Sequence, residues 1–404
     1  MSSFASKLVS SHQALVSAAL CVSLRLAAVL PQRTQRYAEG RREKAAPFRL
    51  GYRPALDGLR GVAILAVLAV HTSHIFGWSL LKGANAGVDI FFVLSGFLIT
   101  TLLIEEWEQT GDVSLKSFYW RRALRLVPAL LVLLTVLYFL SDLFFSPVEA
   151  NDTRRGIPVA FVYASDLALA FFQLHLGALQ HTWSLAIEEH FYLIWPVLLL
   201  AALKFGIRKK SLVLITLLVV IASGLRRASL HQFGAPPVRT YYGIDTRADA
   251  LLIGCVTGLC VSWGLVHVRA LKPFLVPALM FIGFCMVATG FGSSFMTLGG
   301  FTLLAIATAV VIVNVVLAPP GYLSSFLEFG PLVWIGRISY GLYLWHYPIF
   351  KATSFLKMSW PGQLAVALAV TVMVTSLSYY LIERPALSLK RRHKKAQEIV
   401  ITAR

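Results

Sequence analysis

The chain has 404 residues, of which 57% are hydrophobic and only 14% charged, and its mean hydropathy is +0.71. A soluble domain of this length carries about a quarter charged residues, so the composition excludes a soluble globular protein. The formal net charge of +18 would suit a nucleic-acid-binding protein, but the basic residues stand in short blocks between apolar runs. We therefore predict a polytopic membrane protein that binds no nucleic acid and has a single membrane domain.

The first 52 residues divide into an apolar part and a basic part. Leu8–Leu30 is apolar, rich in serine and free of acidic residues, as in an interfacial helix or a targeting sequence. It has no clear small-residue cleavage site, which favours the helix. Pro31–Arg53 is basic and should stay in the cytoplasm. The predicted domains are a basic N-terminal segment over residues 1–52, a membrane domain over 53–387 and a basic tail over 388–404.

Ten segments have roughly the length and apolar character of membrane-spanning helices. They cover residues 60–78, 87–104, 126–145, 182–203, 211–225, 247–265, 273–291, 296–317, 334–352 and 363–382. Residues 157–176 are also apolar, but their internal polar residues and short polar flanks favour a re-entrant or interfacial element. The predicted fold class is all-α, a polytopic transmembrane helix bundle of about ten spans.

The distribution of basic residues indicates the topology. If the N-terminus lies inside, cytoplasmic segments collect 26 of the 37 Lys and Arg residues, and outward loops collect seven. Counting residues 157–176 as a further span would instead place the basic cluster at 204–210 outside. We therefore predict ten spans with the N- and C-termini both in the cytoplasm.

The four cysteines lie in apolar segments and lack the spacing of metal ligands. They are Cys21, Cys255, Cys260 and Cys285. We expect them to be small packing residues and expect no disulfide framework and no metal site.

The first span carries two ionisable residues on one face. Arg60 and His71 are eleven residues apart, which returns them to within ~20° of each other around a helix and separates them by ~16 Å along its axis. An ionisable residue inside a span usually faces the bundle interior or a watery cavity. The pattern therefore indicates a functional site, and the alternative is a buried histidine bonded to a neighbouring helix.

Polar residues also interrupt three other spans. Arg122 and Arg125 stand one turn apart at the start of the third span, and His346 lies in the ninth. Glu188 and Glu189 enter the fourth span and point ~100° apart, so we expect at most one of them to line a cavity.

A long outward segment over residues 226–246 combines positive charge with aromatic rings. It carries Arg226, Arg227, His231, Arg239, Tyr241 and Tyr242. These residues suit an acceptor with sugar rings or acidic groups, and an ordinary structured loop explains them equally well. The adjacent Asp245, Arg247 and Asp249 are expected to be paired charges.

These blocks together resemble the acyltransferase-3 family of integral membrane O-acyltransferases, in the family's order over residues 52–387. The motifs that carry the resemblance are Arg60-x10-His71, the R-x-x-R pair Arg122 and Arg125, SLAIEEHFYLIWP and SYGLYLWHYPI. The resemblance implies that an acyl group, most often acetyl from cytoplasmic acetyl-CoA, moves to a hydroxyl of a glycan or another small acceptor. It also implies that His71 and Arg60 are essential, that the arginine pair engages the donor, and that the protein lies in a bacterial inner membrane.

The residue types suit these roles independently. An imidazole can take the proton of the attacking hydroxyl, and His71 could also carry the acyl group itself. Guanidinium forks fit CoA phosphates, although a plain positive-inside block would look the same. Glu189 could hold the His71 tautomer and stabilise the imidazolium. His346 is a second candidate base or a structural histidine.

A proton-coupled transporter with His71, Glu189 and Arg60 as a relay is the alternative function. The absence of a detectable inverted repeat argues against it. The acceptor stays open among a carbohydrate, a lipid-linked glycan and a secondary metabolite. Only 22 residues follow the last predicted span, so we expect no C-terminal hydrolase-like domain, and transfer would finish in the membrane domain or on a separate partner.

Overall fold

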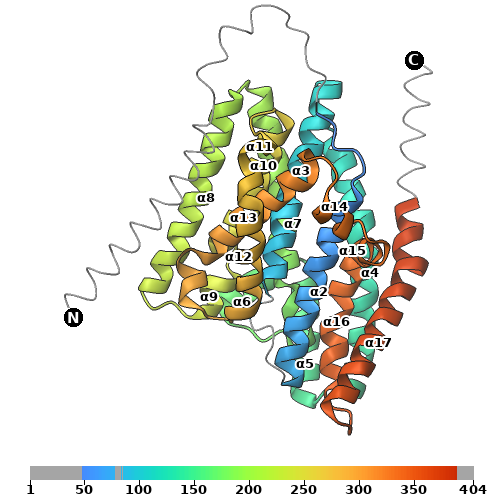
Figure 1. Ribbon diagram of the computed structural model, residues 1–404. Helices are drawn as coiled ribbons and strands as arrows, with labels where there is room; N and C mark the ends of the chain where they lie inside the picture. Colours follow the sequence, from blue (N-terminus) through green and yellow to red (C-terminus); the bar gives the residue numbers. More distant parts are fainter. Residues whose placement is uncertain (1–47, 78–82, 84, 389–404) are drawn as a thin grey trace, which may run out of the picture.

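The computed structural model describes residues 48–77, 83 and 85–388, and every regular element in these residues is a helix (Figure 1). Eight of the described helices are long and apolar enough to cross a membrane. The prediction of an all-α, multi-pass membrane bundle is confirmed. The predicted N-terminal segment over residues 1–52 and the tail over 388–404 lie almost entirely outside the described residues.

The first four predicted spans correspond to long helices. They are α2 (Pro54–Phe76), α3 (Ala86–Thr110), α4 (Leu115–Phe144) and α7 (Trp183–Lys204), the last preceded by the 3-10 helix η1 (Gly177–Thr182). The fifth to eighth spans correspond to α8 (Lys209–Gln232), α10 (Ile244–Ser262), α12 (Leu275–Ala288) and α13 (Phe301–Leu317), and the tenth to α17 (Trp360–Ser378). Short helical segments complete these elements: α9 (Pro237–Tyr242), α11 (Val268–Leu271), η2 (Lys272–Phe274), η3 (Met296–Gly300), α14 (Tyr322–Leu327) and η4 (Tyr379–Glu383).

Two of the ten predicted spans differ from a simple apolar helix. The sixth span forms α10, which is not among the eight helices apolar enough to cross a membrane, because it carries three charged residues near its start. The ninth is divided at Ile338 into α15 (Gly330–Arg337) and α16 (Ser339–Thr353). A Cβ atom at Gly336 would lie 1.8 Å from the Asp57 carbonyl oxygen, so α15 packs directly on the α2 backbone.

The apolar segment over residues 157–176 falls on two short helices with a sharp bend. α5 (Pro147–Phe161) and α6 (Ser165–Phe172) meet at an angle of 119°. This geometry fits the predicted re-entrant or interfacial element, and it would also fit one broken span.

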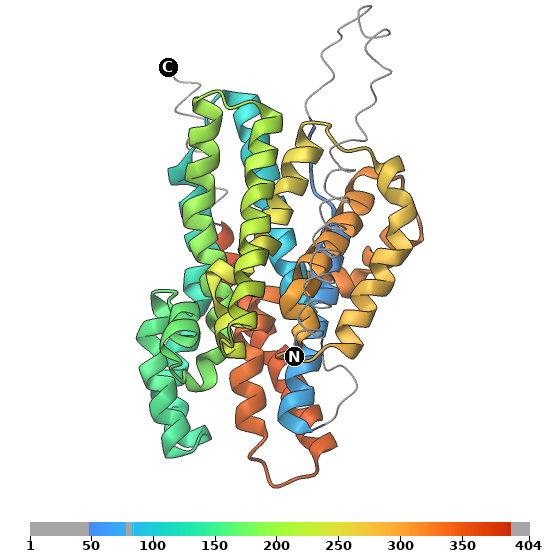
Figure 2. The same ribbon diagram turned by 90° about the vertical axis from the view of Figure 1, so that its left-hand side faces the viewer.

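The bundle places some helices inside and others on its outer surface. Buried residues make up 78% of the most apolar stretch of α3 and 72% of that within Met296–Leu317, which includes α13. The share is only 22% within Val268–Ala288, which includes α12, and within Trp360–Ser388, which includes α17. In Figure 1, α2, α3 and α7 run through the middle of the bundle, and α8 and α17 lie at its left and right sides. Figure 2 shows the same bundle with the α8 side toward the viewer. The outer helices thus present apolar side chains where lipid would lie.

Close packing of α3 on α10 positions charged residues inside the bundle. A Cβ atom at Gly96 would lie 1.9 Å from the Leu251 carbonyl oxygen, and one at Gly254 would lie 2.2 Å from the Val93 carbonyl oxygen. Glycine at both positions lets the two backbones touch, as small residues do at many membrane helix interfaces.

Candidate active site

A cavity lies between α3, α4 and α7, and residues of α16 form part of its wall. Arg60 of α2, Arg122 and Arg125 of α4, and Glu188 and Glu189 of α7 all line this space, which we name the arginine cavity. The Ser114 hydroxyl caps the start of α4 by accepting the Ser117 N–H at 3.3 Å. The arginine pair lies two to three turns beyond this cap, within the regular helix. Five of the seven predicted site residues therefore meet in one place.

Among the described residues, three of the four arginines that line the cavity lack a carboxylate partner, whereas the fourth, Arg121, pairs with Glu106 at 3.6 Å. In the part of the chain that the structure describes, neither Arg60, Arg122 nor Arg125 forms an ion pair with a carboxylate. The Nε of Arg60 is buried and has no hydrogen-bond partner among the described residues. The Arg122 guanidinium stacks over the Tyr192 ring, with 3.7 Å from Cζ to the ring centroid. The cavity wall thus offers unused N–H donors and excess positive charge to an anion.

Both glutamates line the cavity, so the expectation that at most one would do so was wrong. The cavity extends from α3 on one side of α7 to α4 and α16 on the other, so it reaches side chains ~100° apart around that helix. Glu188 accepts hydrogen bonds from the Ser95 hydroxyl at 3.0 Å and from the Tyr192 hydroxyl at 2.9 Å. Its hydrogen bonds therefore come from α3 and α7 and not from the arginines.

His71 and His346 form a second group, which does not line the arginine cavity. Nδ1 of His71 lies 3.1 Å from Nε2 of His346 and 3.0 Å from the Val67 carbonyl oxygen. His71 is half-buried, whereas His346 is fully buried. The structure therefore brings together two histidines that the sequence offered as separate candidate bases.

The predicted contact between Glu189 and His71 is absent from the described part of the chain. Ring atoms of His71 bond only to Val67 and His346 there, and Glu188 bonds to Ser95 and Tyr192. The glutamates lie on the cavity side of α7, and the histidine of α16 occupies the place beside His71 where a carboxylate was expected.

One layer of side chains separates the cavity from the histidine pair. Ser184 and Tyr343 line the cavity and share a hydrogen bond at 2.6 Å, and the Tyr343 hydroxyl also lies 2.7 Å from the His181 carbonyl oxygen. The His181 ring packs against the His346 ring, with centroids 5.4 Å apart. Sequence reasoning missed His181 and Tyr343, although both are polar residues at or inside the predicted spans.

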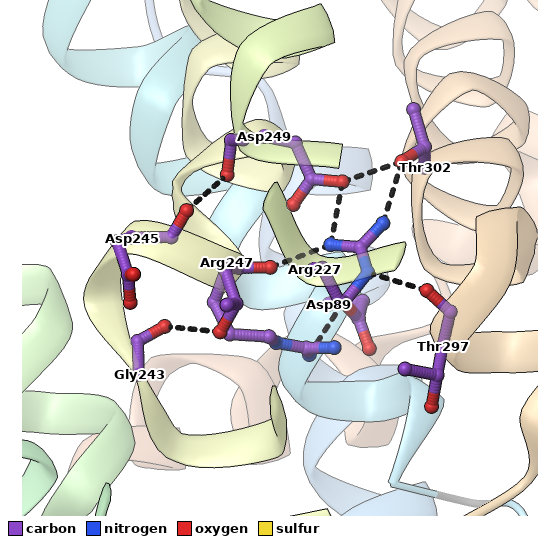
Figure 3. A network of polar contacts seen from close by, with 10 residues as sticks. Asp89, Arg227, Gly243, Asp245, Arg247, Asp249, Thr297 and Thr302 are labelled. Carbon is purple, nitrogen blue, oxygen red and sulfur yellow. Dashed lines mark hydrogen bonds and ion pairs between the residues drawn. The ribbon is translucent and has the colours of Figure 1, made fainter. Parts of the chain in front are cut away.

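A second buried group of charges lies between α3, α8, α10 and α13 (Figure 3). Arg247 donates to Asp89 at 2.7 Å, and Arg227 pairs with Asp249 at 2.9 Å. We name these four residues the ion-pair cluster. Arg227 also donates to the Thr246 carbonyl oxygen, the Thr297 carbonyl oxygen and the Thr302 hydroxyl.

The cluster corrects two expectations from the sequence. Arg227, Tyr241 and Tyr242 were placed in an outward segment that could meet an acceptor, but all three are buried. α8 continues to Gln232, beyond the predicted end of the fifth span, and carries Arg227 into the interior. Arg247 and Asp249 are paired as predicted, but with partners on α3 and α8 instead of with each other.

The chain was compared with known proteins and families. The acyltransferase-domain family matches residues 53–383, which is most of the chain. The chain belongs to this family. The predicted resemblance to membrane acyltransferases is therefore confirmed, and the transporter alternative gains no support.

The curated proteins that the chain is similar to are named as O-acetyltransferases. The chain is 38% identical over 353 residues to the peptidoglycan O-acetyltransferase OatA of Listeria monocytogenes, and 33% identical over 357 residues to the putative peptidoglycan O-acetyltransferase YrhL of Bacillus subtilis. Each alignment covers 83% of this chain but only 56% and 55% of those proteins, so the chain spans little more than half of their length. No solved structure matches.

Proposed function

We propose that the chain is a membrane O-acyltransferase that moves an acyl group, in the first instance acetyl, from acyl-CoA to a hydroxyl of a carbohydrate. The observation that carries the proposal is the arginine cavity, where three guanidinium groups face one space without carboxylate partners. The phosphates of CoA would supply the missing negative charge, and each guanidinium can bind a phosphate through two N–H groups. We propose Arg122 and Arg125 as donor-binding residues.

The distance from Arg60 to His71 indicates that donor binding and acyl transfer take place at different positions along α2. The two residues lie in one helix and are ~16 Å apart along its axis. Arg60 therefore contributes to donor binding and does not stabilise charge at the reacting carbon. A donor whose phosphates lie at the arginines needs a long arm to bring its thioester to His71, and CoA has such an arm. The layer formed by Ser184 and Tyr343 has to move aside for the acyl end of the donor.

His71 is proposed as the general base. Its imidazole takes the proton of the acceptor hydroxyl as that oxygen attacks the thioester carbonyl carbon. The carbon–sulfur bond then breaks, and the leaving thiolate takes the proton from the imidazolium. A covalent route through an acyl-His71 intermediate needs the same residue and is separated from direct transfer by the experiment below.

The acceptor is proposed to be the glycan of peptidoglycan, because that polymer is named for the similar proteins from Listeria and Bacillus. The half-buried Tyr347 ring lies beside His71, with ring centroids 5.2 Å apart, and Lys351 pairs with Glu149 one turn further along α16. An aromatic face and polar groups next to the base suit a sugar hydroxyl. The identity of the acylated product would show whether the acceptor is instead a lipid-linked glycan or a secondary metabolite.

The end of the bundle that carries the start of α8 is proposed to face the cytoplasm. Lys204 and Lys209 pair there with Asp112 and Glu108, so the basic loop before α8 lies beside the end of α3. A cysteine placed at position 209 should resist a membrane-impermeant thiol reagent in intact cells, and one at 154 should react. Labelling at position 209 together with protection at position 154 would show that the bundle has the opposite orientation in the membrane.

The test of the proposed activity uses the purified chain in lipid nanodiscs with acetyl-CoA and a soluble peptidoglycan fragment. We expect release of free CoA that depends on the acceptor, and an acetyl group on the fragment by mass spectrometry. His71→Ala should lower the rate about 10²- to 10⁴-fold while donor binding persists. The control is His74→Ala, because His74 is exposed and one turn further along the same helix.

Absence of acceptor acylation by the wild-type chain would contradict the proposal, and near-normal transfer by His71→Ala would place the base elsewhere. A single turnover with labelled acetyl-CoA and no acceptor separates the two routes. Label retained on the wild type but not on His71→Ala supports the acyl-histidine route, and no retained label supports direct transfer.

A further inference from the structure

The contact between the two histidines determines which nitrogen of His71 carries its proton. Nδ1 of His346 lies 3.0 Å from the Leu342 carbonyl oxygen, one turn back along α16. A carbonyl oxygen only accepts hydrogen bonds, so Nδ1 of His346 must be the N–H donor. A neutral imidazole has a single N–H, which leaves Nε2 of His346 as an acceptor.

This acceptor faces Nδ1 of His71 at 3.1 Å. Nδ1 of His71 also lies 3.0 Å from the Val67 carbonyl oxygen. Both neighbours accept, so Nδ1 of His71 is protonated and Nε2 carries the free lone pair. The opposite tautomers would set nitrogen lone pairs against carbonyl oxygens at 3.0 Å in both residues, which is repulsive.

Packing holds His346 in this orientation. Its side chain is fully buried, and its ring contacts the Phe350 and His181 rings with centroids 5.6 Å and 5.4 Å away. Both of its nitrogens are engaged, one by Leu342 and the other by His71. Neither ring nitrogen of His346 is left to take the proton of a substrate hydroxyl. Of the two roles that the sequence leaves open for His346, this geometry favours the structural one.

We propose that His346 is the positioning residue of the reaction: it fixes His71 with the proton on Nδ1 and the lone pair of Nε2 toward the substrates. When His71 takes the acceptor proton at Nε2, the Nδ1–H bond to His346 strengthens, because the donor is then a cation. His346 fills the place that a carboxylate holds in a serine hydrolase triad. This inference deepens the proposed function and rests on it.

The first measurement needs no reaction. Histidine labelled with 15N in the full chain gives chemical shifts that distinguish protonated from unprotonated ring nitrogens, and the His71 signals are assigned by their loss in His71→Ala. We expect the Nδ1–H form in the wild type and in His346→Gln, whose amide oxygen can accept the same hydrogen bond. In His346→Phe the Val67 carbonyl oxygen still accepts from Nδ1, so we expect the Nδ1–H form to remain the major one beside a minor Nε2–H form that the wild type lacks. A wild-type His71 protonated on Nε2, or a His346→Phe variant without that minor form, would overturn the proposal.

The second measurement separates positioning from donor binding. His346→Phe should lower kcat about 100-fold with KM for acetyl-CoA within about twofold of wild type, and His346→Gln should recover at least a tenth of the lost rate. An unchanged kcat in His346→Phe would contradict the inference. It would also be contradicted if His346→Gln kept the wild-type tautomer of His71 but had a kcat no higher than that of His346→Phe. A wild type without transferase activity would overturn the proposed function instead, and the 15N result would still decide the tautomer.

Discussion

The arginine cavity and the ion-pair cluster contain the same residue types in opposite states of pairing. In the cluster, Arg247 and Arg227 each have a carboxylate within 2.9 Å, and all four side chains are buried. In the cavity, Arg122 and Arg125 are half-buried and lack a carboxylate partner in the described residues. Positive charge is thus satisfied by the protein in one region and left open in the other.

The difference teaches how to recognise a site among buried charges. A cluster whose charges balance within the protein has a structural role, because it leaves no net charge for an incoming ion. A cavity whose cations lack partners is completed by an anion from outside. Glu188 fits this reading, because its hydrogen bonds come from Ser95 and Tyr192 and, in the described residues, it forms no ion pair with a guanidinium group.

The largest effect is expected from breaking one pair of the cluster. Arg247→Met leaves the carboxylate of Asp89 fully buried and unpaired, which should lower the free energy of unfolding by about 3–5 kcal/mol. Unfolding of the purified protein in mixed detergent micelles measures the loss. The double variant Asp89→Leu/Arg247→Met should regain most of it, because no charge is then left alone. Equal stability of single variant and wild type would show that the pair is dispensable.

The corresponding change in the cavity should affect binding and spare stability. Arg125→Ala removes a donor to phosphate and should weaken acetyl-CoA binding about 10- to 100-fold, with Arg125→Lys recovering part of the affinity. Its free energy of unfolding should not fall, because no partner is left behind. The matched control is Lys116→Ala on the same helix, because Lys116 is exposed and does not line the arginine cavity. Titration calorimetry measures the affinities, and an Arg125→Ala variant that binds normally but unfolds easily would reverse the comparison.

A smaller effect is expected from the ring under Arg122. Tyr192→Leu removes the cation–π contact and should weaken donor binding about fivefold, whereas Tyr192→Phe keeps the ring and should stay within about twofold of wild type. The same titration tests both variants. If the Phe variant bound the donor as weakly as the Leu variant, the hydrogen bond from the Tyr192 hydroxyl to Glu188, and not the ring, would position the Arg122 guanidinium group.

The sequence predicts those features that depend on one helix at a time. Arg60 and His71 share α2, and the R-x-x-R pair lies in the first half of α4, because periodicity and charge placement are local properties. The contact between His71 and His346 joins residues 275 positions apart, so no local pattern reveals it. Arg227 was misplaced for a related reason: only its partner on α10 makes a charged residue favourable inside the bundle.

The smallest effect is expected from an ion pair at the edge of the bundle, and it tests whether pairing or burial distinguishes the two regions. Lys209 lies 3.7 Å from Glu108, and the Lys209 side chain is 58% exposed. Solvent screens such a pair, so Glu108→Gln should change the free energy of unfolding by less than about 1 kcal/mol. Donor binding should be unaffected, because neither residue lines the arginine cavity. The same unfolding and titration measurements apply. If Glu108→Gln were as destabilising as Arg247→Met, pairing alone would explain the stability of the cluster. If Glu108→Gln leaves the free energy of unfolding unchanged, burial decides whether an ion pair contributes to stability.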